Sequence, residues 1–410
     1  MDMLDGRTRS ELGCARNPDF SGRPFMGKDQ TSALDDLISE RKILVCVGSG
    51  GVGKTTTSAA IALRAAMLGK NALVVTVDPA KRLANALGMA SMPATPVEIP
   101  LKNASGQLTG LMFDTKTTFD AVIRKHAKDQ SNAHDILTNP FYEKASTTLA
   151  GAHEYMAMEQ LLMVHEERDY DLIVLDTPPS AHAIDFLEAP ERLLRFLESV
   201  QTRALLRTAR AMKGPFGLFR VTGLVARGVS RFVGSAFIEN LIQFIQSFDN
   251  LYDGFRSRAA RAQDLIRSNA TGFVVVHAPE ETTLREAARF DTRLSEANMN
   301  VDAFLANRVH LAADFDVEVA QEQVEQLCEN EPALELYTET TRNRLAKKII
   351  QLHQQLEFLA SQDREALNTI ADRANSRTPA IPLFVTPHFD SALHSLEGLD
   401  RFARSTKRFA

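Results

Sequence analysis

Short apolar runs alternate with longer helical stretches along most of the chain. Seven runs of four to six residues, bounded by Gly, Asp or Pro, have the length and composition of strands that are buried on both faces. These runs are Ile43–Val47, Leu73–Val77, Leu108–Phe113, Leu172–Leu175, Gly272–Val276, Ala303–Ala306 and Ile381–Val385. Helices between successive strands imply parallel crossovers, so the pattern predicts an α/β fold with a doubly wound, mostly parallel sheet.

The spacing between these strands is uneven, which predicts helical insertions in the sheet. We expect residues 41–399 to form one domain, with helical insertions at about 116–168, 191–270 and 311–378. Residues 1–40 are polar and lack sustained periodicity, so we expect a flexible leader with a short helix around Ser32–Glu40. Residues 400–410 are expected to form a C-terminal tail.

Composition excludes several classes of protein. Hydrophobic residues make up 44% and charged residues 24% of the 410 residues, which is the composition of a globular protein. The net charge of −5 argues against a nucleic-acid-binding polycation. Cys14, Cys46 and Cys328 are far apart and form no CxxC pair, which fits a reducing compartment. The start has no signal-peptide character, and no apolar run is long enough to span a membrane. We therefore expect a cytoplasmic protein whose membrane contact, if any, is peripheral and at the inner face.

Charge is divided between two segments. From Arg192 to Ile238 there are nine Lys or Arg and one acid, interleaved with apolar residues and glycines, whereas Leu311 to Thr341 holds nine acids and no Lys or Arg. In the basic segment, three arginines have the spacing of one helical face: Arg220, Arg227 and Arg231. This segment suits a hydrophobic client helix or an anionic membrane surface, but an ordinary helical subdomain with solvated arginines explains it equally well. The acidic segment has the composition of a solvated helix face.

A phosphate-binding motif follows the first predicted strand and opens an Ala-rich helix. The motif G-x-x-x-x-G-K-[ST] is matched by Gly48, Ser49, Gly50, Gly51, Val52, Gly53, Lys54 and Thr55, with Thr56 next in the helix. Backbone N–H groups of such a loop and the helix N-terminus bind phosphates. Lys54 is expected to reach the β- and γ-phosphates, and the Thr55 hydroxyl to coordinate Mg²⁺. A Gly-rich turn without a ligand is the alternative, and it does not account for the strand and helix on either side.

Two acids end predicted strands near this loop. Asp176 follows Leu172–Leu175 and either holds Mg²⁺ through a water molecule or caps a turn. Asp78 follows Leu73–Val77 and precedes a proline. It either orients the water that attacks the γ-phosphate or is the N-cap of a helix over residues 81–87. Sequence spacing alone leaves both alternatives open.

Together these motifs resemble the ArsA-type ATPases, a deviant P-loop class that includes anion-pump and tail-anchored-protein-insertion ATPases. The P-loop, the segment Val77–Gly88 (similar to switch I) and the segment Asp176–Pro190 (similar to switch II) carry the resemblance. Leu149–Glu154 resembles the segment between the switches, and Asn307 resembles an adenine-contacting asparagine. The C-terminal adenine loop is similar to Val385–His388, which includes Thr386 and Pro387, together with Leu396–Leu399. The overall likeness is to a bacterial branch with a single P-loop.

This resemblance implies a Mg²⁺-dependent ATP hydrolase that uses ATP and Mg²⁺. Lys54 and Asp78 would be the catalytic residues, Asp78 orienting the water, and Asp176 would sense Mg²⁺ and the γ-phosphate. It also implies a homodimer or pseudodimer with nucleotides at its interface. ATP hydrolysis would drive a conformational cycle that serves a membrane-associated partner or a hydrophobic client.

Three departures from the family pattern change these expectations. Ser49 stands where the family usually has a second P-loop lysine, which reaches across the dimer to the partner's phosphates. A paralogous ATPase could supply that cation, so a catalytically weak regulatory subunit of a heterodimer is the alternative function. The CxxC pair that holds an interface zinc is missing, and the three scattered cysteines argue against an arsenite site. A kinase-like phosphotransferase is a third alternative, but no acceptor-site motif accompanies the P-loop.

Overall fold

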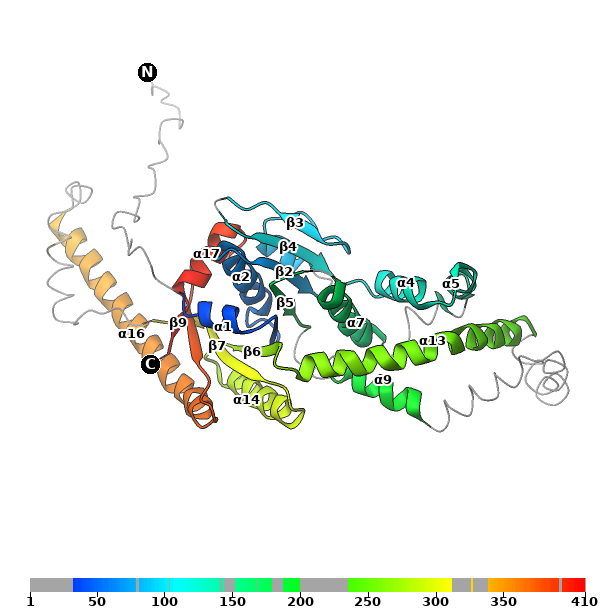
Figure 1. Cartoon of the computed structure of the whole chain (residues 1–410). Helices are drawn as coiled ribbons and strands as arrows, with labels where there is room; N and C mark the ends of the chain where they lie inside the picture. The colour runs from blue at the N-terminus through cyan, green and yellow to red at the C-terminus, as the bar shows by residue number, and fades with distance from the viewer. Residues whose placement is uncertain are drawn as a thin grey trace, which may run out of the picture. The chain divides into compact units, whose positions relative to one another are not determined.

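A mostly parallel sheet of nine strands is the centre of the structure (Figure 1). The computed structural model describes residues 32–78, 81–102, 104–140, 142–143, 152–167, 169–178, 187–199, 235–311, 326, 338–390 and 393–409, with only the backbone of residues 152, 167, 196 and 235–250. The strands are β1 (Ile43–Gly48), β2 (Asn71–Thr76), β3 (Val97–Ile99), β4 (Gln107–Met112), β5 (Leu172–Asp176), β6 (Thr271–His277), β7 (Val301–Val309), β8 (Leu383–Pro387) and β9 (Lys407–Arg408). They lie in the order β3-β4-β2-β5-β1-β6-β7-β8-β9, and β3 and β9 are antiparallel to their neighbours.

The sheet confirms the predicted fold class. Each of the seven predicted strands is present, with ends within three residues of those expected. The two strands that were not predicted are the antiparallel edge strands β3 and β9, which have three and two residues. Runs this short carry no readable alternation of apolar and polar residues, so the hydrophobic pattern could not indicate them.

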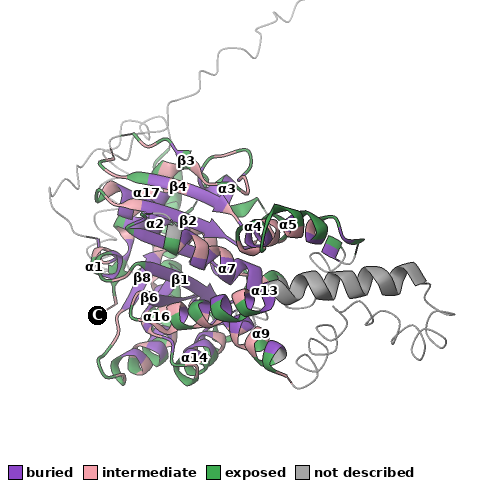
Figure 2. Cartoon of the chain, turned by 45° about the vertical axis from the view of Figure 1, so that its right-hand side comes forward, coloured by how far each residue is buried: buried purple, intermediate pink, exposed green. Residues whose placement is uncertain are grey.

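Helices cover both faces of the sheet, and each face has its own apolar core. The helices are α1 (Asp35–Glu40), α2 (Lys54–Met67), α3 (Arg82–Ala86), α4 (Thr115–His126), α5 (Gln130–Leu137), α7 (Ala152–Glu167), α9 (Ala189–Glu198), α13 (Ser235–Arg267), α14 (Glu281–Glu296), α16 (Glu339–Asn375) and α17 (Leu396–Ser405). Strand β1 contributes to both cores, because Ile43, Val45 and Val47 face one and Leu44 and Cys46 face the other. Figure 2 shows this layering as a buried sheet between helices whose outer sides are exposed. A strand covered on both faces has few polar positions, which is why the strands read as continuous apolar runs.

Both predicted ends of the folded domain are wrong in the described residues. The short helix expected near Ser32–Glu40 is present as α1, but it is part of the core and not of a leader, since Leu34, Leu37 and Ile38 are buried. Asp35 also forms an ion pair with Arg64 of α2. At the other end, α17 and β9 occupy most of the expected tail, and β9 pairs with β8. Each of these two segments contains only a few apolar residues, and most of the residues around them are polar. The sequence pattern therefore favoured a leader and a tail.

Helices occupy the described parts of the three intervals where insertions were expected. The first contains α4, α5 and α7, the second contains α9 and α13, and the third contains α16. A buried ion pair between Glu159 of α7 and Arg258 of α13 connects two of these helices, and the Tyr155 hydroxyl donates to Glu159 at 2.9 Å. The arginine face predicted in the basic segment (residues 220–231) lies outside the described residues, as does most of the acidic segment.

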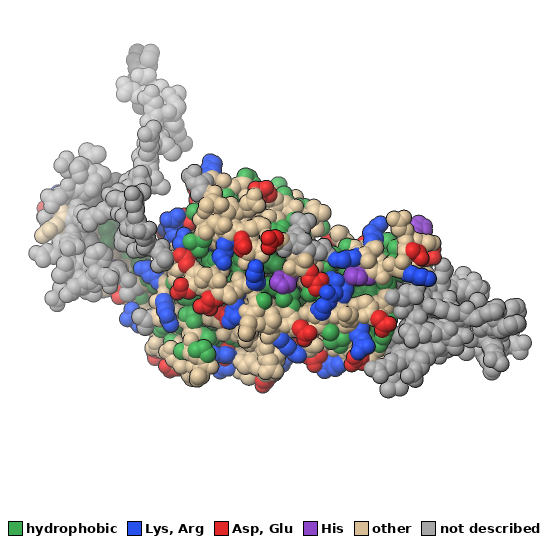
Figure 3. All heavy atoms as spheres, viewed as in Figure 1, with side chains coloured by type: hydrophobic (Ala, Val, Ile, Leu, Met, Phe, Trp, Pro, Cys, Tyr) green, Lys and Arg blue, Asp and Glu red, His purple; other side chains and the backbone are tan. Residues whose placement is uncertain are grey.

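The surface of the described residues carries charges of both signs. On the face in Figure 3, basic and acidic side chains are interspersed. Among the described helices, none combines the length and the apolar character that crossing a membrane requires.

The order of the strands determines where a ligand is expected. After β1 the chain crosses over to β2 on one side of the sheet, whereas β6 and β7 extend the sheet on the other side of β1. In open α/β sheets, such a reversal leaves a crevice at the carboxyl ends of the strands, and ligands bind there. The P-loop follows the carboxyl end of β1 and therefore lies at this crevice.

Candidate functional site

The loop between β1 and α2 is formed by glycines that no larger residue could replace without strain. A Cβ atom at Gly48 would lie 2.1 Å from the carbonyl oxygen of Val276 in β6. Gly53, the last residue before α2, has φ +99° in the left-handed region. The expected P-loop is thus present with its strand and helix, and α2 begins at Lys54.

Lys54 lies at the first position of α2 and turns back over the loop. Its ammonium group donates hydrogen bonds to the carbonyl oxygens of Gly48 (3.0 Å) and Ser49 (2.8 Å). The side chain is buried, and burial lowers its pKa, while the nearby Asp176 carboxylate raises it. A buried cation at the N-terminus of a helix is well placed to attract an anion.

A chain of hydrogen bonds runs from the P-loop helix to the segment after β2. The hydroxyls of Thr55 and Thr76 both donate to the same oxygen of Asp176, Oδ2, at 2.8 and 2.9 Å. The Thr76 hydroxyl in turn accepts the backbone N–H of Asp78 at 3.2 Å. The structure therefore brings together Thr55, Asp176 and Asp78, which are separated by up to 121 residues in the sequence.

The Asp176 carboxylate is buried next to the first turn of α2. Within the described residues, Oδ1 is buried without a hydrogen-bond partner. Burial raises the pKa of Asp176 to about 6, although the two threonine hydroxyls act in the opposite direction. A buried carboxylate oxygen next to a threonine hydroxyl is suitable for Mg²⁺, which is often held by one or two protein groups together with phosphates and water. No group of three or more His, Cys, Asp or Glu that could form a complete metal cage occurs in the described part of the chain.

Asp78 does not occupy the N-cap position that was the alternative to a catalytic role. Helix α3 begins at Arg82, and the residue at its N-cap is Lys81. The Asp78 carboxylate instead lies 3.3 Å from the guanidinium of Arg82, in a pair in which the side chain of Asp78 is 16% exposed. Its carboxylate is thus accessible at the edge of the site.

A cavity of about 660 Å³ connects the P-loop with the ends of β7 and β8. A drug-sized ligand pocket typically has 300–1,000 Å³, so a nucleotide is within range. Of the predicted site residues, those that line the cavity are Gly51, Gly53, Lys54, Thr55, Thr56, Asp78, Asn307 and Pro387. The remaining predicted residues, which do not line it, are Gly48, Ser49, Gly50, Val52, Thr386 and Asp176.

Asn307 connects the end of β7 to the P-loop. Its side-chain amide donates to the carbonyl oxygen of Val52 at 2.9 Å, and its Oδ1 accepts the N–H of Arg308 at 2.9 Å. Arg308 has φ +61°, and the pairing of β7 with β8 shifts register between Ala306 and Val309. This irregularity at the end of β7 turns the backbone so that both Asn307 and Arg308 line the cavity.

The loop after β8 contributes the opposite wall. Pro387 and the next three residues line the cavity, but the Thr386 hydroxyl is fully buried and lies 3.1 Å from that of Thr406. The expected contact of the Thr386 side chain with a nucleotide is therefore not supported by its position. Its role here is to connect β8 to the end of α17.

Several cavity residues were not predicted as site residues. They are Arg82, Asn85, Ala86, Thr177, Arg308, His388, Phe389, Asp390, Leu393, His394 and Phe402. The sequence contained a signal for some of them, since Arg82 lies four residues after Asp78 and Arg308 follows Asn307 directly. Asn85, Ala86 and Thr177 lie within the two switch-like segments, although they were not named as site residues. The residues after β8 and on α17 reach the cavity through tertiary packing, which sequence spacing does not indicate.

The contact of Gly53 with Asn307 predicts a specific loss of stability. A Cβ atom at Gly53 would lie 2.2 Å from Nδ2 of Asn307, and the residue also has positive φ. Gly53→Ala is therefore expected to lower the free energy of unfolding by about 2–4 kcal/mol, from backbone strain and overpacking together. Urea denaturation of the full chain measures this change.

Gly51→Ala is the matched control for this variant. Gly51 also has positive φ, at +82°, but nothing lies within 4 Å of a Cβ atom placed there. Gly51→Ala should lower the free energy of unfolding by about 1 kcal/mol, through backbone strain alone. Equal losses in the two variants would show that the contact with Asn307 contributes nothing.

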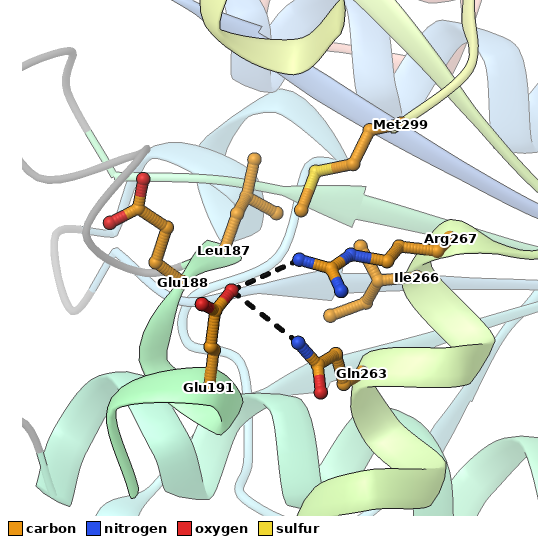
Figure 4. A pocket seen from close by; sticks show the side chains of 7 residues that line it. All are labelled: Leu187, Glu188, Glu191, Gln263, Ile266, Arg267 and Met299. Atoms are coloured by element: carbon orange, nitrogen blue, oxygen red, sulfur yellow. Dashed lines mark hydrogen bonds and ion pairs between the residues drawn. The ribbon is translucent and has the colours of Figure 1, made fainter. Parts of the chain in front are cut away.

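A second, much smaller crevice lies between α9, α13 and the residues before β7. In Figure 4, Arg267 and Gln263 point toward Glu191, whose Oε2 accepts from them at 3.0 and 3.4 Å. The crevice has a volume of about 10 Å³, which holds one water molecule at most. It is part of the packing between these helices and not a ligand site.

The described cysteine is unsuited to bind a soft metal ion. Cys46 lies in β1, fully buried, and burial raises the pKa of its thiol to about 12. Metal ligation requires the thiolate. Cys14 and Cys328 lie outside the described residues.

Comparisons with known proteins agree with this geometry. The family model described as anion-transporting ATPase matches residues 41–331. ATPase get3 of Aspergillus terreus is 25% identical over 285 residues, which are 69% of this chain and 78% of that protein. An ATPase ASNA1 homolog of Entamoeba dispar is 26% identical over 266 residues, 64% of this chain and 74% of that protein.

The match covers the P-loop, both candidate acids and Asn307, and it ends before the loop after β8. It also spans well over half of the chain, together with the parallel sheet and the P-loop that the structure contains. The chain therefore belongs to the anion-transporting ATPase family, the ArsA-type P-loop ATPases.

Proposed function

We propose that the chain is a Mg²⁺-dependent ATPase whose hydrolysis of ATP drives a dimer through a cycle of opening and closing. The observation that carries this proposal is the chain of hydrogen bonds from Thr55 through Asp176 and Thr76 to Asp78. It connects the group that would contact Mg²⁺ to the group that would orient water. A change at the γ-phosphate position can therefore be transmitted to the segment after β2 through short, direct contacts.

The cavity suggests how ATP is oriented. The phosphates would bind to the backbone N–H groups of residues 49–55 and to Lys54, at the N-terminus of α2. The adenine would lie toward Asn307 and Pro387, which line the same cavity and belong to the ends of β7 and β8.

Thr55 and Asp176 would hold Mg²⁺, with Asp176 binding through a water molecule. When bound, Mg²⁺ neutralises charge on the β- and γ-phosphates in phosphoryl transfer. This assignment is supported by Oδ1 of Asp176, which is buried and has no hydrogen-bond partner within the described residues.

Asp78 would orient the attacking water and accept its proton. In the structure its carboxylate is paired with Arg82 at the cavity wall. In this role the Asp78 carboxylate would turn from Arg82 toward the bound γ-phosphate.

The dimer would be a homodimer or a heterodimer with a paralogous ATPase, and it would serve a membrane-associated partner or a hydrophobic client. Family membership and the relatives support an ATPase of this kind. The basic and apolar segment Arg192–Ile238 is proposed to contact a client helix or the membrane surface, and most of it, residues 200–234, lies outside the described residues. Affinity capture with Asp78→Asn in the presence of ATP, followed by identification of the bound proteins, tests this part. Capture of the same proteins without ATP would contradict a nucleotide-driven cycle.

One observation favours a second candidate, the regulatory subunit of a heterodimer. Ser49 replaces the family's second P-loop lysine, and its buried hydroxyl has no hydrogen-bond partner within the described residues. The carbonyl oxygen of Ser49, in contrast, accepts a hydrogen bond from the Lys54 ammonium group. In this alternative the chain binds nucleotide, and a paralogous subunit provides the missing cation.

Ser49→Lys is expected to raise turnover of the isolated chain by about tenfold or more if the missing cation limits hydrolysis, since one donor to a transition-state charge contributes 10²–10³. Steady-state phosphate release measures the change. Ser49→Ala is the control, because it removes the hydroxyl without adding a charge. If both variants hydrolyse ATP at the wild-type rate, with and without a paralogue, the absence of a lysine at position 49 does not limit hydrolysis.

A further inference from the structure

Two described arginines, Arg82 and Arg308, line the candidate nucleotide cavity. Arg308 lies near the end of β7, whereas Arg82 is the first residue of α3 and comes four residues after Asp78, the acid proposed to orient water. The guanidinium of Arg82 lies 3.3 Å from the Asp78 carboxylate. Arg82 was not predicted as a site residue, and the proposed function gives it no task beyond this pair.

The Arg82 side chain has hydrogen-bond donors that the protein does not use. A guanidinium carries five N–H donors in a planar fork, which matches the oxygens of a phosphate. In the described part of the chain, Arg82 makes no hydrogen bond or ion pair besides the pair with Asp78, and its side chain is 61% exposed. The guanidinium is therefore available to an anion that binds in the cavity.

The distances that hydrolysis requires place this guanidinium near the γ-phosphate. A group that orients the attacking water lies about 2.6–3.2 Å from it, and the water lies about 3–3.5 Å from the phosphorus. An oxygen of the Asp78 carboxylate would therefore lie about 6 Å from the γ-phosphorus. Because Arg82 lies beside this carboxylate, its long side chain would reach the oxygens of the same phosphate.

The electrostatics of the P-loop also indicate where the charge of Arg82 acts. Burial is the main cause that lowers the pKa of Lys54, and the positive charge of Arg82 lowers this pKa further. The carboxylates of Asp176 and Asp78 raise it. The charge of Arg82 thus acts at the position of the P-loop lysine, which is expected to contact the β- and γ-phosphates.

One cation of the usual family site is absent from the P-loop of this chain. Ser49 stands at the position of the second lysine, and Lys54 is the one cation among residues 48–55. In P-loop hydrolases, an arginine of the same chain or of a partner can supply such a charge. A guanidinium is well suited to this task, because it can donate two parallel hydrogen bonds to one phosphate.

We propose that Arg82 is a catalytic residue that binds the γ-phosphate of the ATP held by its own chain and so replaces the missing P-loop lysine. In hydrolysis the water oxygen bonds to the γ-phosphorus, the bond from phosphorus to the bridging oxygen breaks, ADP keeps that oxygen, and the proton of the water goes to Asp78. Arg82 stabilises the negative charge on the γ-phosphoryl oxygens. The inference rests on the proposed ATPase function and makes a paralogous subunit unnecessary for hydrolysis.

The first test is single-turnover hydrolysis of bound ATP by Arg82→Gln in Mg²⁺. The rate is expected to fall at least about a thousandfold, the lower end of what an arginine finger contributes. Arg82→Lys keeps the charge but loses the planar fork, so it should regain at least about tenfold of this loss. A glutamine that left the rate unchanged would show that the guanidinium does not act in hydrolysis.

Arg404→Gln is the matched control. Arg404 is also 61% exposed and also pairs with an acid four residues before it, Asp400, at 2.8 Å. It does not line the cavity. Its substitution should leave the single-turnover rate within about threefold of the wild type.

The second test measures binding and not turnover. ADP with aluminium fluoride imitates the phosphoryl group during transfer, and a residue that contacts this group binds the complex more strongly than it binds ADP. In isothermal titration calorimetry with Mg²⁺, Arg82→Gln should weaken binding of the aluminium fluoride complex at least about a hundredfold and change the affinity for ADP less than about threefold. An arginine that only maintained the shape of the cavity would affect both ligands equally.

A mixture of Arg82→Gln and Lys54→Ala chains determines which nucleotide the arginine serves. In a pair of these chains, the first binds ATP and the second supplies an intact Arg82. Because we propose that Arg82 acts on the ATP of its own chain, the mixture should hydrolyse ATP no faster than Arg82→Gln alone. Faster hydrolysis would show that Arg82 acts across a dimer interface.

Three results would overturn the inference: a wild-type rate in Arg82→Gln, equal losses of affinity for ADP and for the aluminium fluoride complex, or recovery of hydrolysis in the mixture. Failure of the ATPase proposal has a different signature, because the wild type itself would then bind ATP without hydrolysing it. A wild type that hydrolyses ATP, together with an Arg82→Gln variant that does so equally fast, would overturn this inference alone.

Discussion

Lys54→Ala is expected to weaken ATP binding by about 10- to 100-fold and to reduce turnover at least about a thousandfold. Lys54 is the buried cation of the P-loop, and its ammonium group lies against the carbonyl oxygens of Gly48 and Ser49. A phosphate bound at the N-terminus of α2 would lose both the charge and a hydrogen bond from this group. Isothermal titration calorimetry with ATP and a phosphate-release assay measure the two effects.

Two controls separate the role of the charge from that of the loop. Lys54→Gln keeps a donor for the loop carbonyls but removes the charge, so it should lose binding and turnover nearly as far as Lys54→Ala. Lys70 also donates to a backbone carbonyl, that of Ile38 at 3.1 Å, but lies outside the cavity. Lys70→Ala should therefore bind ATP normally. Wild-type affinity and turnover in both Lys54 variants would refute the assignment of the P-loop.

Asp78→Asn is expected to retain ATP and Mg²⁺ binding and to slow hydrolysis by about 10²- to 10⁴-fold, the usual contribution of a group that activates or positions water. Asparagine has the same shape as aspartate and can still accept a hydrogen bond from Arg82, so the cavity should keep its form. What it loses is the ability to accept a proton. Single-turnover hydrolysis of bound ATP measures this step apart from binding and product release.

Asp390→Asn is the matched control for Asp78→Asn. Asp390 also lines the cavity, in the loop after β8, and is not part of the hydrogen-bond chain through Thr55 and Asp176. Its substitution should leave the single-turnover rate within about threefold of the wild type, since it has no part in positioning water. A normal rate in Asp78→Asn would make this acid structural, and Asp176 would then be the next candidate.

The strands of this fold could be predicted because almost all of them are buried on both faces. In β1 every residue is buried, so the sequence there is a single apolar run between polar residues. Edge strands lack this signature, which is why β3 and β9 were missed. Helix α1 was placed but assigned to the leader, because its two buried residues, Leu37 and Ile38, stand among charged ones and their burial depends on packing against α2.

The candidate site was predictable where neighbours in sequence are neighbours in space. The P-loop is one continuous segment, so its strand, loop and helix could be inferred together. Asn307 was found only through a family resemblance, since its contact with Val52 joins residues 255 apart. Arg308 and Phe389 were not assigned, because a bulge in β7 and the packing of the loop after β8 determine their approach to the cavity.

The most direct test of the proposed function is single-turnover hydrolysis of radiolabelled ATP by the purified full chain, with Mg²⁺ and with excess EDTA. We expect phosphate to be released from bound ATP when Mg²⁺ is present and the release to stop in EDTA. In Lys54→Ala we expect weaker ATP binding and no detectable release on the same time scale. ATP that stays intact on the wild-type chain in excess Mg²⁺, or phosphate release that EDTA does not slow, would contradict a Mg²⁺-dependent ATPase at this cavity.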